Sequence, residues 1–118
     1  MLAGWSKDWK ANGWDFRATM APRFQGEALE SNLALVEEIA TVASDLDATA
    51  GQVALAWVLQ RADNIATIPG TTKVSNLRQN LGAADVKLTS AAVARLDALA
   101  AKVKGERYNE DGMKGVNG

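Results

Sequence analysis

Residues 65–80 have the sequence Ile65-Ala66-Thr67-Ile68-Pro69-Gly70-Thr71-Thr72-Lys73-Val74-Ser75-Asn76-Leu77-Arg78-Gln79-Asn80. The first four residues are mostly β-branched and too few for a helix, so they predict a short strand at 65–68. Pro69 cannot donate to a sheet ladder and ends the strand, and Gly70 permits a sharp bend. A helix is then predicted from Val74 to Leu81, with Gly82 as its stop.

The turn between this strand and this helix has the chemistry of an anion site. The first N–H groups of a helix have no intrahelical partner, and the helix dipole favours negative charge there. Thr71 and Thr72 offer hydroxyl groups that can cap those N–H groups, and Lys73 adds a full positive charge. The pattern therefore indicates a phosphate at the turn.

Three amide side chains follow the turn within two helical turns. Asn76 and Asn80 share a helix face because they are four residues apart, and Gln79 lies beside them. Amides carry donors and acceptors, which suits a purine edge or a ribose. The alternative is a capped helix with no ligand, as occurs in many α/β proteins.

Several blocks along the chain resemble the last third of an aldo-keto reductase. They are Pro22-Arg23-Phe24-Gln25-Gly26-Glu27, Gln52-Val53-Ala54-Leu55-Ala56-Trp57-Val58-Leu59, Ile68-Pro69-Gly70-Thr71-Thr72-Lys73, Asn80-Leu81-Gly82-Ala83, Val86-Lys87-Leu88-Thr89 and Gly105-Glu106-Arg107-Tyr108. Their order is that of the family, and the resemblance covers nearly everything after Asp15. It implies that 65–82 correspond to the eighth strand of a (β/α)8 barrel and the helix after it.

The resemblance also implies a cofactor, NADP(H), and assigns residues to it. Gly70, Thr71, Thr72 and Lys73 would hold the adenosine 2′-phosphate, whereas the adenosine would lie along the three amides, Asn76, Gln79 and Asn80. Many family members have an arginine at the position of Asn76. The absence of this arginine weakens phosphate binding, because arginine offers a bidentate fork and a stacking plane.

The catalytic residues of the family are not matched. Such reductases use an aspartate, a tyrosine, a lysine and a histidine on earlier strands, to pass hydride and a proton to an aldehyde or ketone. This chain has no histidine, and its one tyrosine, Tyr108, lies in the C-terminal tail. No catalytic residue is therefore assigned, and the chain alone is expected not to turn over a carbonyl substrate unless the rest of a barrel completes it.

Composition narrows the other classes of function. The chain has 118 residues, a net charge of −1 and no cysteine. It is thus one domain at most, with no expected nucleic-acid or membrane partner, no disulfide and no cysteine metal site. Without histidine a metal site would need clustered oxygen ligands, and no such spacing occurs. No long apolar run or signal pattern is present, so the expected location is cytoplasmic.

The remaining sequence divides into three parts. Residues 1–28 are predicted to be loop-like, with Trp5, Trp9 and Trp14 either forming a substrate lid or covering apolar surface. Residues 29–103 form the helical domain that contains 65–82. The tail, 104–118, is rich in glycine and predicted to be mobile.

Three further helices are predicted in the helical domain. The first spans 29–46, with an apolar stripe of Leu29, Leu33, Val36, Ala40 and Ala43, joined by Ile39 and Leu46. The second follows a capping box from Thr49 to Gln52 and runs to about Arg61, with Trp57 as a core anchor. The third spans 90–103, after Thr89 as its cap.

The expected fold is mostly α: four helices and at most one short strand, as in the C-terminal part of a reductase barrel. One strand cannot satisfy its own backbone groups. It can remain an extended linker, pair with the same strand of a second copy, or belong to a larger assembly. Uncovered apolar helix faces favour a homo-oligomer, and a dimer is the simplest one. Two functions follow: the cofactor-binding part of an NADPH-dependent reductase, or a non-catalytic truncated or mobile-gene product that forms a small helical oligomer.

Overall fold

The computed structural model describes residues 20–116 of the chain. Its α-helices are α2 (Gly26–Asp45), α3 (Ala50–Leu59), α4 (Val74–Gly82), α5 (Ser90–Ala100) and α6 (Glu110–Met113). Two 3-10 helices, η1 (Pro22–Phe24) and η2 (Ala83–Asp85), complete the order. No strand occurs within residues 20–116, so the predicted mostly α fold is confirmed for the described part of the chain.

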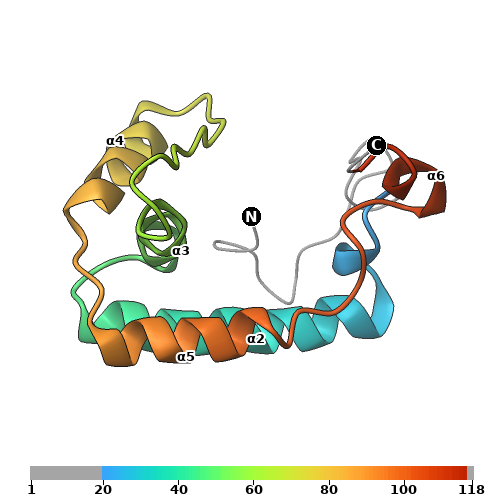
Figure 1. The fold of residues 1–118 in the computed structure, drawn as a ribbon, viewed down its shortest axis with the longest axis horizontal. Helices are drawn as coiled ribbons and strands as arrows, with labels where there is room; N and C mark the ends of the chain where they lie inside the picture. Colours follow the sequence, from blue (N-terminus) through green and yellow to red (C-terminus); the bar gives the residue numbers. More distant parts are fainter. Residues whose placement is uncertain (1–19, 117–118) are drawn as a thin grey trace.

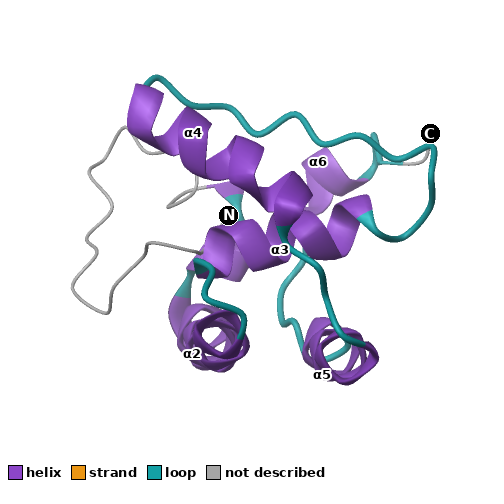
Figure 2. Ribbon diagram, turned by 90° about the vertical axis from the view of Figure 1, so that its left-hand side faces the viewer, coloured by secondary structure: helices purple, strands orange, loops and turns teal. Residues whose placement is uncertain are grey.

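The two longest helices form the base of the molecule. α2 and α5 lie side by side and run in opposite directions (Figure 1), and the end-on view confirms that they are neighbours (Figure 2). α3 packs on α2, and α4 and η2 pack in turn on α3. The helices therefore stack outward from the base, with α4 furthest from it.

The core lies where α2, α3 and α5 meet. Its buried residues are Val42 and Ala43 from α2, Val53 from α3, and Ala92 and Leu96 from α5. Further apolar side chains pack around them from Ile39, Leu46, Ala48, Trp57 and Leu88. Burial of this kind supplies most of the free energy that holds short helices together.

Polar contacts join the helices at the edge of this core. Asp97 of α5 accepts a hydrogen bond from the indole Nε1 of Trp57 at 2.8 Å and forms an ion pair with Arg61. The Arg61 guanidinium also lies 4.0 Å from the centroid of the Trp57 ring. Arg95 of α5 pairs with Asp45 of α2 at 3.6 Å. These exposed contacts align α5 with its neighbours, and each contributes little free energy alone.

A second buried centre joins η1 to the segment after α5. Asn32, 1% exposed, donates through Nδ2 to the carbonyl oxygens of Arg23 and Lys104, and its Oδ1 accepts from the Lys104 N–H at 2.9 Å. Arg23 Nε donates to the Gly105 carbonyl at 2.8 Å. Gly105 has φ +84°, and a Cβ there would approach the Arg23 backbone to 3.0 Å, so glycine is required. The predicted mobility of the tail stays a prediction, but its described part, up to 116, is attached at these points.

Several helix bounds differ from those predicted. α2 begins at Gly26 rather than 29, α3 ends at Leu59 rather than near Arg61, and α5 ends at Ala100 rather than 103. In the α2 stripe Ala40 is exposed, whereas Asn32 and Val42 are buried. The buried face of α2 is therefore rotated about the helix axis relative to the predicted apolar stripe, and it includes a buried asparagine. Trp5, Trp9 and Trp14 lie outside the described residues.

The predicted strand at 65–68 does not form. Residues 65–71 carry no helix, strand, turn or bend assignment, and they run along the outer edge of the molecule between α3 and α4 (Figure 2). A strand needs a hydrogen-bonded neighbour, and residues 20–116 of one copy offer none. Among the outcomes left open by the sequence, the described chain shows the extended linker.

None of the described helices combines the length and apolar character needed to cross a membrane.

Candidate functional site

The candidate site is the turn that leads into α4. Lys73 is the N-cap residue of this helix, in extended conformation with φ −109° and ψ 126°, and no side chain caps the helix. The Thr71 hydroxyl instead accepts a hydrogen bond from the Lys73 N–H at 3.2 Å, before the helix begins. The prediction that Thr71 or Thr72 caps α4 is therefore wrong, and the first helical N–H groups keep their donor capacity.

The bend in this turn lies two residues later than predicted. The backbone bends at Thr72, whereas Gly70 lies in the unbent segment and does not have positive φ. A Cβ built on Gly70 meets no atom within 4 Å. The special conformational freedom of glycine is therefore not used at Gly70 in this structure, and the prediction of a sharp glycine bend is wrong.

The electrostatics of the turn favour an anion. Every residue from Gly70 to Gln79 is exposed, including Lys73. Within the described part of the chain, no carboxylate lies in ion-pair distance of Lys73 or Arg78. The ion pairs found there join α2 to α5, Arg61 after α3 to α5, and Asp111 of α6 to Lys114. The cationic charge of Lys73 thus adds to the positive end of the α4 dipole without internal neutralisation.

The amide residues follow on the same helix. Asn76 and Gln79 are exposed, Asn80 is half-buried, and their spacing on α4 places Asn76 and Asn80 on one face. The structure thus brings the seven predicted site residues, from Gly70 to Asn80, into one turn and the helix that follows. Arg78, the other cation of α4, falls on the opposite face with Val74 and Leu81.

Sequence reasoning missed the residue that positions α4. Gln52 accepts from the Thr49 N–H through Oε1 at 3.0 Å and donates through Nε2 to the Gln79 carbonyl at 3.1 Å. A Cβ on Gly82 would lie 2.7 Å from that Nε2, so glycine leaves space for the bond. The capping box revealed the first bond, but the second depends on how α3 packs on α4, which no local pattern encodes.

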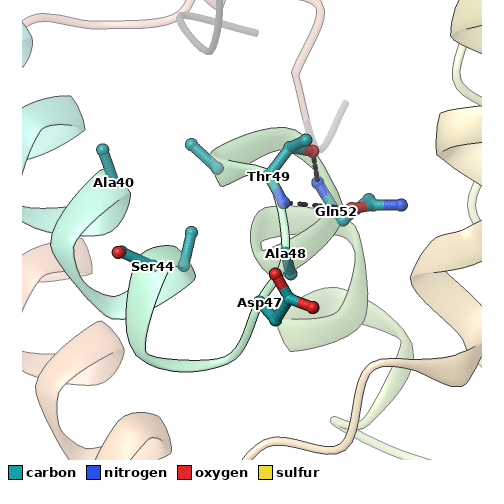
Figure 3. Close-up of a pocket in the computed structure, with 8 residues that line it drawn as sticks. Ala40, Ser44, Asp47, Ala48, Thr49 and Gln52 are labelled. Atoms are coloured by element: carbon teal, nitrogen blue, oxygen red, sulfur yellow. Dashed lines mark hydrogen bonds between the residues drawn. The ribbon is translucent and has the colours of Figure 1, made fainter.

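A shallow hollow lies between the end of α2 and the start of α3 (Figure 3). Its lining residues are Ala40, Ala43, Ser44, Asp47, Ala48, Thr49, Ala50 and Gln52. The Thr49 hydroxyl accepts from the Gln52 N–H, so the start of α3 already has its capping partner. Half of its lining residues are alanine, and it holds one ionisable side chain, Asp47. It is therefore not a catalytic constellation.

Over residues 20–116, no group of three or more histidine, cysteine or acidic side chains is arranged to hold a metal ion.

Comparison with known proteins identifies the family. The sequence model of the Aldo/keto reductase family matches residues 1–101. The chain belongs to the aldo/keto reductase family. It is also similar to a protein from Glycine max named probable aldo-keto reductase 1, with 52% identity over 68 residues. That match covers 58% of this chain and 20% of the relative. The chain therefore spans about a fifth of this aldo-keto reductase.

Proposed function

We propose that residues 70–80 form the part of an NADP(H)-dependent oxidoreductase that holds the adenosine 2′-phosphate. The observation that carries the proposal is the uncapped start of α4, with Lys73 exposed beside it and no carboxylate within ion-pair distance among the described residues. A phosphate at this position would accept hydrogen bonds from the first N–H groups of α4 and pair with Lys73. Family membership supports the cofactor class.

The other site residues have distinct roles in this proposal. The Thr71 hydroxyl orders the turn through the Lys73 N–H, Gly70 leaves space beside the phosphate, and Thr72 places the bend. The amides of Asn76, Gln79 and Asn80 contact the adenosine. Gln52 is a positioning residue, because its hydrogen bond to the Gln79 carbonyl fixes α4 on α3.

We further propose that this chain does not reduce carbonyl compounds alone. The family chemistry needs a proton donor near the nicotinamide. The sequence holds no histidine, and its one tyrosine, Tyr108, lies two residues before the start of α6. α6 and α4 lie at opposite sides of the molecule (Figure 1). An aldehyde or ketone would become a substrate only in a complete barrel.

The cytoplasmic location expected from the sequence remains a prediction.

Ligand titration tests the phosphate site. Because the turn is exposed, salt screens Lys73, and we expect 2′-phospho-AMP to bind with a dissociation constant of about 1 mM, on the order of −4 kcal/mol. Lys73→Met should weaken 2′-phospho-AMP about tenfold, as expected for the loss of one charge-assisted hydrogen bond, and should barely change AMP binding. NMR titration of the Gly70 to Asn76 amides measures both ligands.

Lys87→Met is the matched control for this titration. Lys87 is also exposed but follows η2, outside the turn, so its loss should leave both affinities unchanged. Added salt should reduce the difference between the two ligands. Equal shifts with AMP and 2′-phospho-AMP, or an equal effect of Lys87→Met, would leave α4 as a structural helix without a phosphate site.

An activity assay tests the catalytic part. Incubation of the chain with NADPH and a nitrobenzaldehyde should give no loss of nicotinamide absorbance beyond the rate without protein. Turnover clearly above that rate would show that the chain carries its own proton donor.

The second candidate function is a small, non-catalytic helical oligomer. It is favoured by apolar side chains exposed between α3 and the end of α4: Ile65, Ile68, Val74, Leu77 and Leu81. Contiguous exposed apolar surface usually contacts a partner. Light scattering after size-exclusion chromatography separates this candidate from a monomeric phosphate-binding unit, and the two are compatible if an oligomer also binds 2′-phospho-AMP.

A further inference from the structure

Two glutamine side chains of α3 attach the segment that carries the candidate site. Gln52 Nε2 donates to the Gln79 carbonyl at 3.1 Å, and Gln60 Nε2 donates to the Val86 carbonyl at 2.8 Å. Gln60 is the C-cap residue of α3, and Val86 directly follows η2. The Gln60–Val86 bond therefore joins the two ends of the excursion 61–85, and the candidate site lies between them.

The spacing of these two bonds gives α4 a direction as well as a position. α4 and η2 are contiguous, and both pack on α3 (Figures 1 and 2). The two donors are eight residues apart on α3 and the two acceptors seven residues apart, or about 12 Å and about 10 Å at the rise of a helix. One bond would act as a pivot, whereas two bonds at this separation also resist rotation of α4 on α3.

Local propensity alone does not keep α4 helical. The helix has nine residues, and isolated helices shorter than about 12 residues are marginal in water. Its first turn contains Val74, Ser75 and Asn76, which are weaker helix formers than alanine or leucine. Contacts with α3 must therefore supply part of the free energy that keeps α4 ordered. The packing of η2 on α3 and the two glutamine bonds are contacts of this kind.

The phosphate site exists only while α4 is helical. The N–H groups that would bind the phosphate converge at the start of a formed helix. The amides of Asn76 and Asn80 share a face only at helical spacing. A nucleotide would thus bind the docked, helical segment in preference to an undocked one. A ligand that prefers one of two states shifts the equilibrium toward it, and this coupling is reciprocal.

We propose that α4 and η2 dock on α3 in a step of their own, that nucleotide binding closes this step, and that the Gln60–Val86 bond carries the closure to the far end of the segment. The inference rests on the proposed function, because it needs a nucleotide at residues 70–80. Gln60 is then a positioning residue outside the site: Val86 lies six residues, or about 9 Å, beyond Asn80, the last residue assigned to the nucleotide.

Hydrogen exchange measures the docking step at amides that the nucleotide does not contact. The Ala83 N–H donates to the Asn80 carbonyl, and the Val86 N–H donates to the Ala83 carbonyl at 3.3 Å. Both amides should exchange at least tenfold faster, relative to their intrinsic rates, than the amide of Leu96 in the core, because a separate step opens before global unfolding. At about 10 mM 2′-phospho-AMP, ten times the expected dissociation constant, exchange of both should slow about tenfold.

Gln60→Met tests the role of the glutamine, because it removes the donor and keeps a side chain of similar length. Without ligand it should accelerate exchange of the Val86 amide roughly two- to tenfold, as expected for one lost hydrogen bond. The slowing of Val86 by 2′-phospho-AMP should then fall below about threefold, because the end of the segment opens independently of α4. Lys87→Met is the matched control: Lys87 is exposed beside Val86, and its loss should leave the tenfold slowing intact.

The possible results separate this inference from the proposed function. If the wild-type chain does not bind 2′-phospho-AMP, the proposed function fails, and the coupling fails with it. If the turn amides shift with ligand but exchange of Ala83 and Val86 does not change, the phosphate site stands and the coupling is overturned. Exchange of both amides as slow as that of Leu96 would overturn the separate docking step. Equal behaviour of Gln60→Met and Lys87→Met would overturn the role of Gln60.

Discussion

The core formed by α2, α3 and α5 and the site segment, residues 65–82, are organised on different principles. The core buries Val42, Val53 and Leu96, whereas α4 has no buried residue and exposes Val74, Leu77 and Leu81. The same chain therefore contains one region that packing stabilises and another that only a few contacts hold in place. The segment with the candidate site is the one whose apolar groups still lack a partner.

This difference indicates that stability depends on the helix core, whereas ligand binding depends on the site segment. Binding residues are often carried on segments that a rigid scaffold positions. Here the scaffold is the helix core, and α4 is linked to it by the Gln52–Gln79 hydrogen bond and by the packing of α4 and η2 against α3. Substitutions in the core should therefore change stability, whereas those in the turn should change binding.

The largest effect should come from the core. Leu96→Ala removes a side chain that is 5% exposed, and the resulting cavity should cost about 2–5 kcal/mol of unfolding free energy. Leu81→Ala is the matched control, because Leu81 is 66% exposed, and it should change stability by less than about 0.5 kcal/mol. Urea unfolding followed by circular dichroism measures both. Comparable losses would show that α4 is packed in solution.

The second effect concerns Asn32, the buried polar residue of α2. Asn32→Ala leaves the Lys104 N–H and two carbonyl groups without their partner, so we expect a loss of about 1–3 kcal/mol. Hydrogen exchange of the Lys104 amide should accelerate together with that loss. Asn76→Ala, an exposed asparagine in the site segment, is the control and should alter neither quantity. An unchanged Lys104 amide in Asn32→Ala would mean that the tail detaches already in the wild type.

The sequence predicted the elements that follow from local rules. The capping box at Thr49 and Gln52 is confirmed, α4 starts at Val74 as predicted, and the family assigned by resemblance is confirmed by the match over residues 1–101. The two helix starts depend on neighbouring residues, and the family assignment depends on the order of several short blocks along the chain. Such information is fully present in one sequence.

Predictions that needed a distant partner were less accurate. The strand at 65–68 requires a neighbour that residues 20–116 do not supply, and the buried face of α2 depends on how Asn32 meets Lys104, 72 residues away. The burial of Asn32 could nevertheless have been predicted, because its spacing places it on the same helix face as Ile39 and Ala43. A polar residue in an apolar stripe indicates a buried hydrogen-bond network. The cofactor role of the turn remains a prediction.

A third pair of variants compares the two threonines that precede helices. Thr49→Ala removes the hydroxyl that accepts from the Gln52 N–H, and loss of such a cap costs about 1 kcal/mol. Thr71 bonds only within an exposed turn, so Thr71→Ala should cost less than about 0.5 kcal/mol but weaken 2′-phospho-AMP. Thermal unfolding and ligand titration on both variants separate the effects. A larger stability loss for Thr71→Ala would mean that it caps α4 after all.

The smallest effect should come from Gly82, where two opposing contributions nearly cancel. Gly82 has φ −61°, which suits any residue, so Gly82→Ala should gain about 0.5–1 kcal/mol from helix propensity. The new Cβ, however, would lie 2.7 Å from Gln52 Nε2 and displace its bond to the Gln79 carbonyl. The loss of that bond costs about 0.5–1.5 kcal/mol.

A double-mutant cycle separates these two contributions. In a Gln52→Ala background the hydrogen bond is already absent, so Gly82→Ala should show its full propensity gain. The difference between the two backgrounds should then be about 0.5–1.5 kcal/mol, even though the single Gly82→Ala variant unfolds close to the wild type. The lost cap of α3 is common to both variants that lack Gln52 and cancels. Additive effects would show that the Gln52–Gln79 bond does not position α4 in solution, and the site segment would then be held on the core by the packing of α4 and η2 against α3.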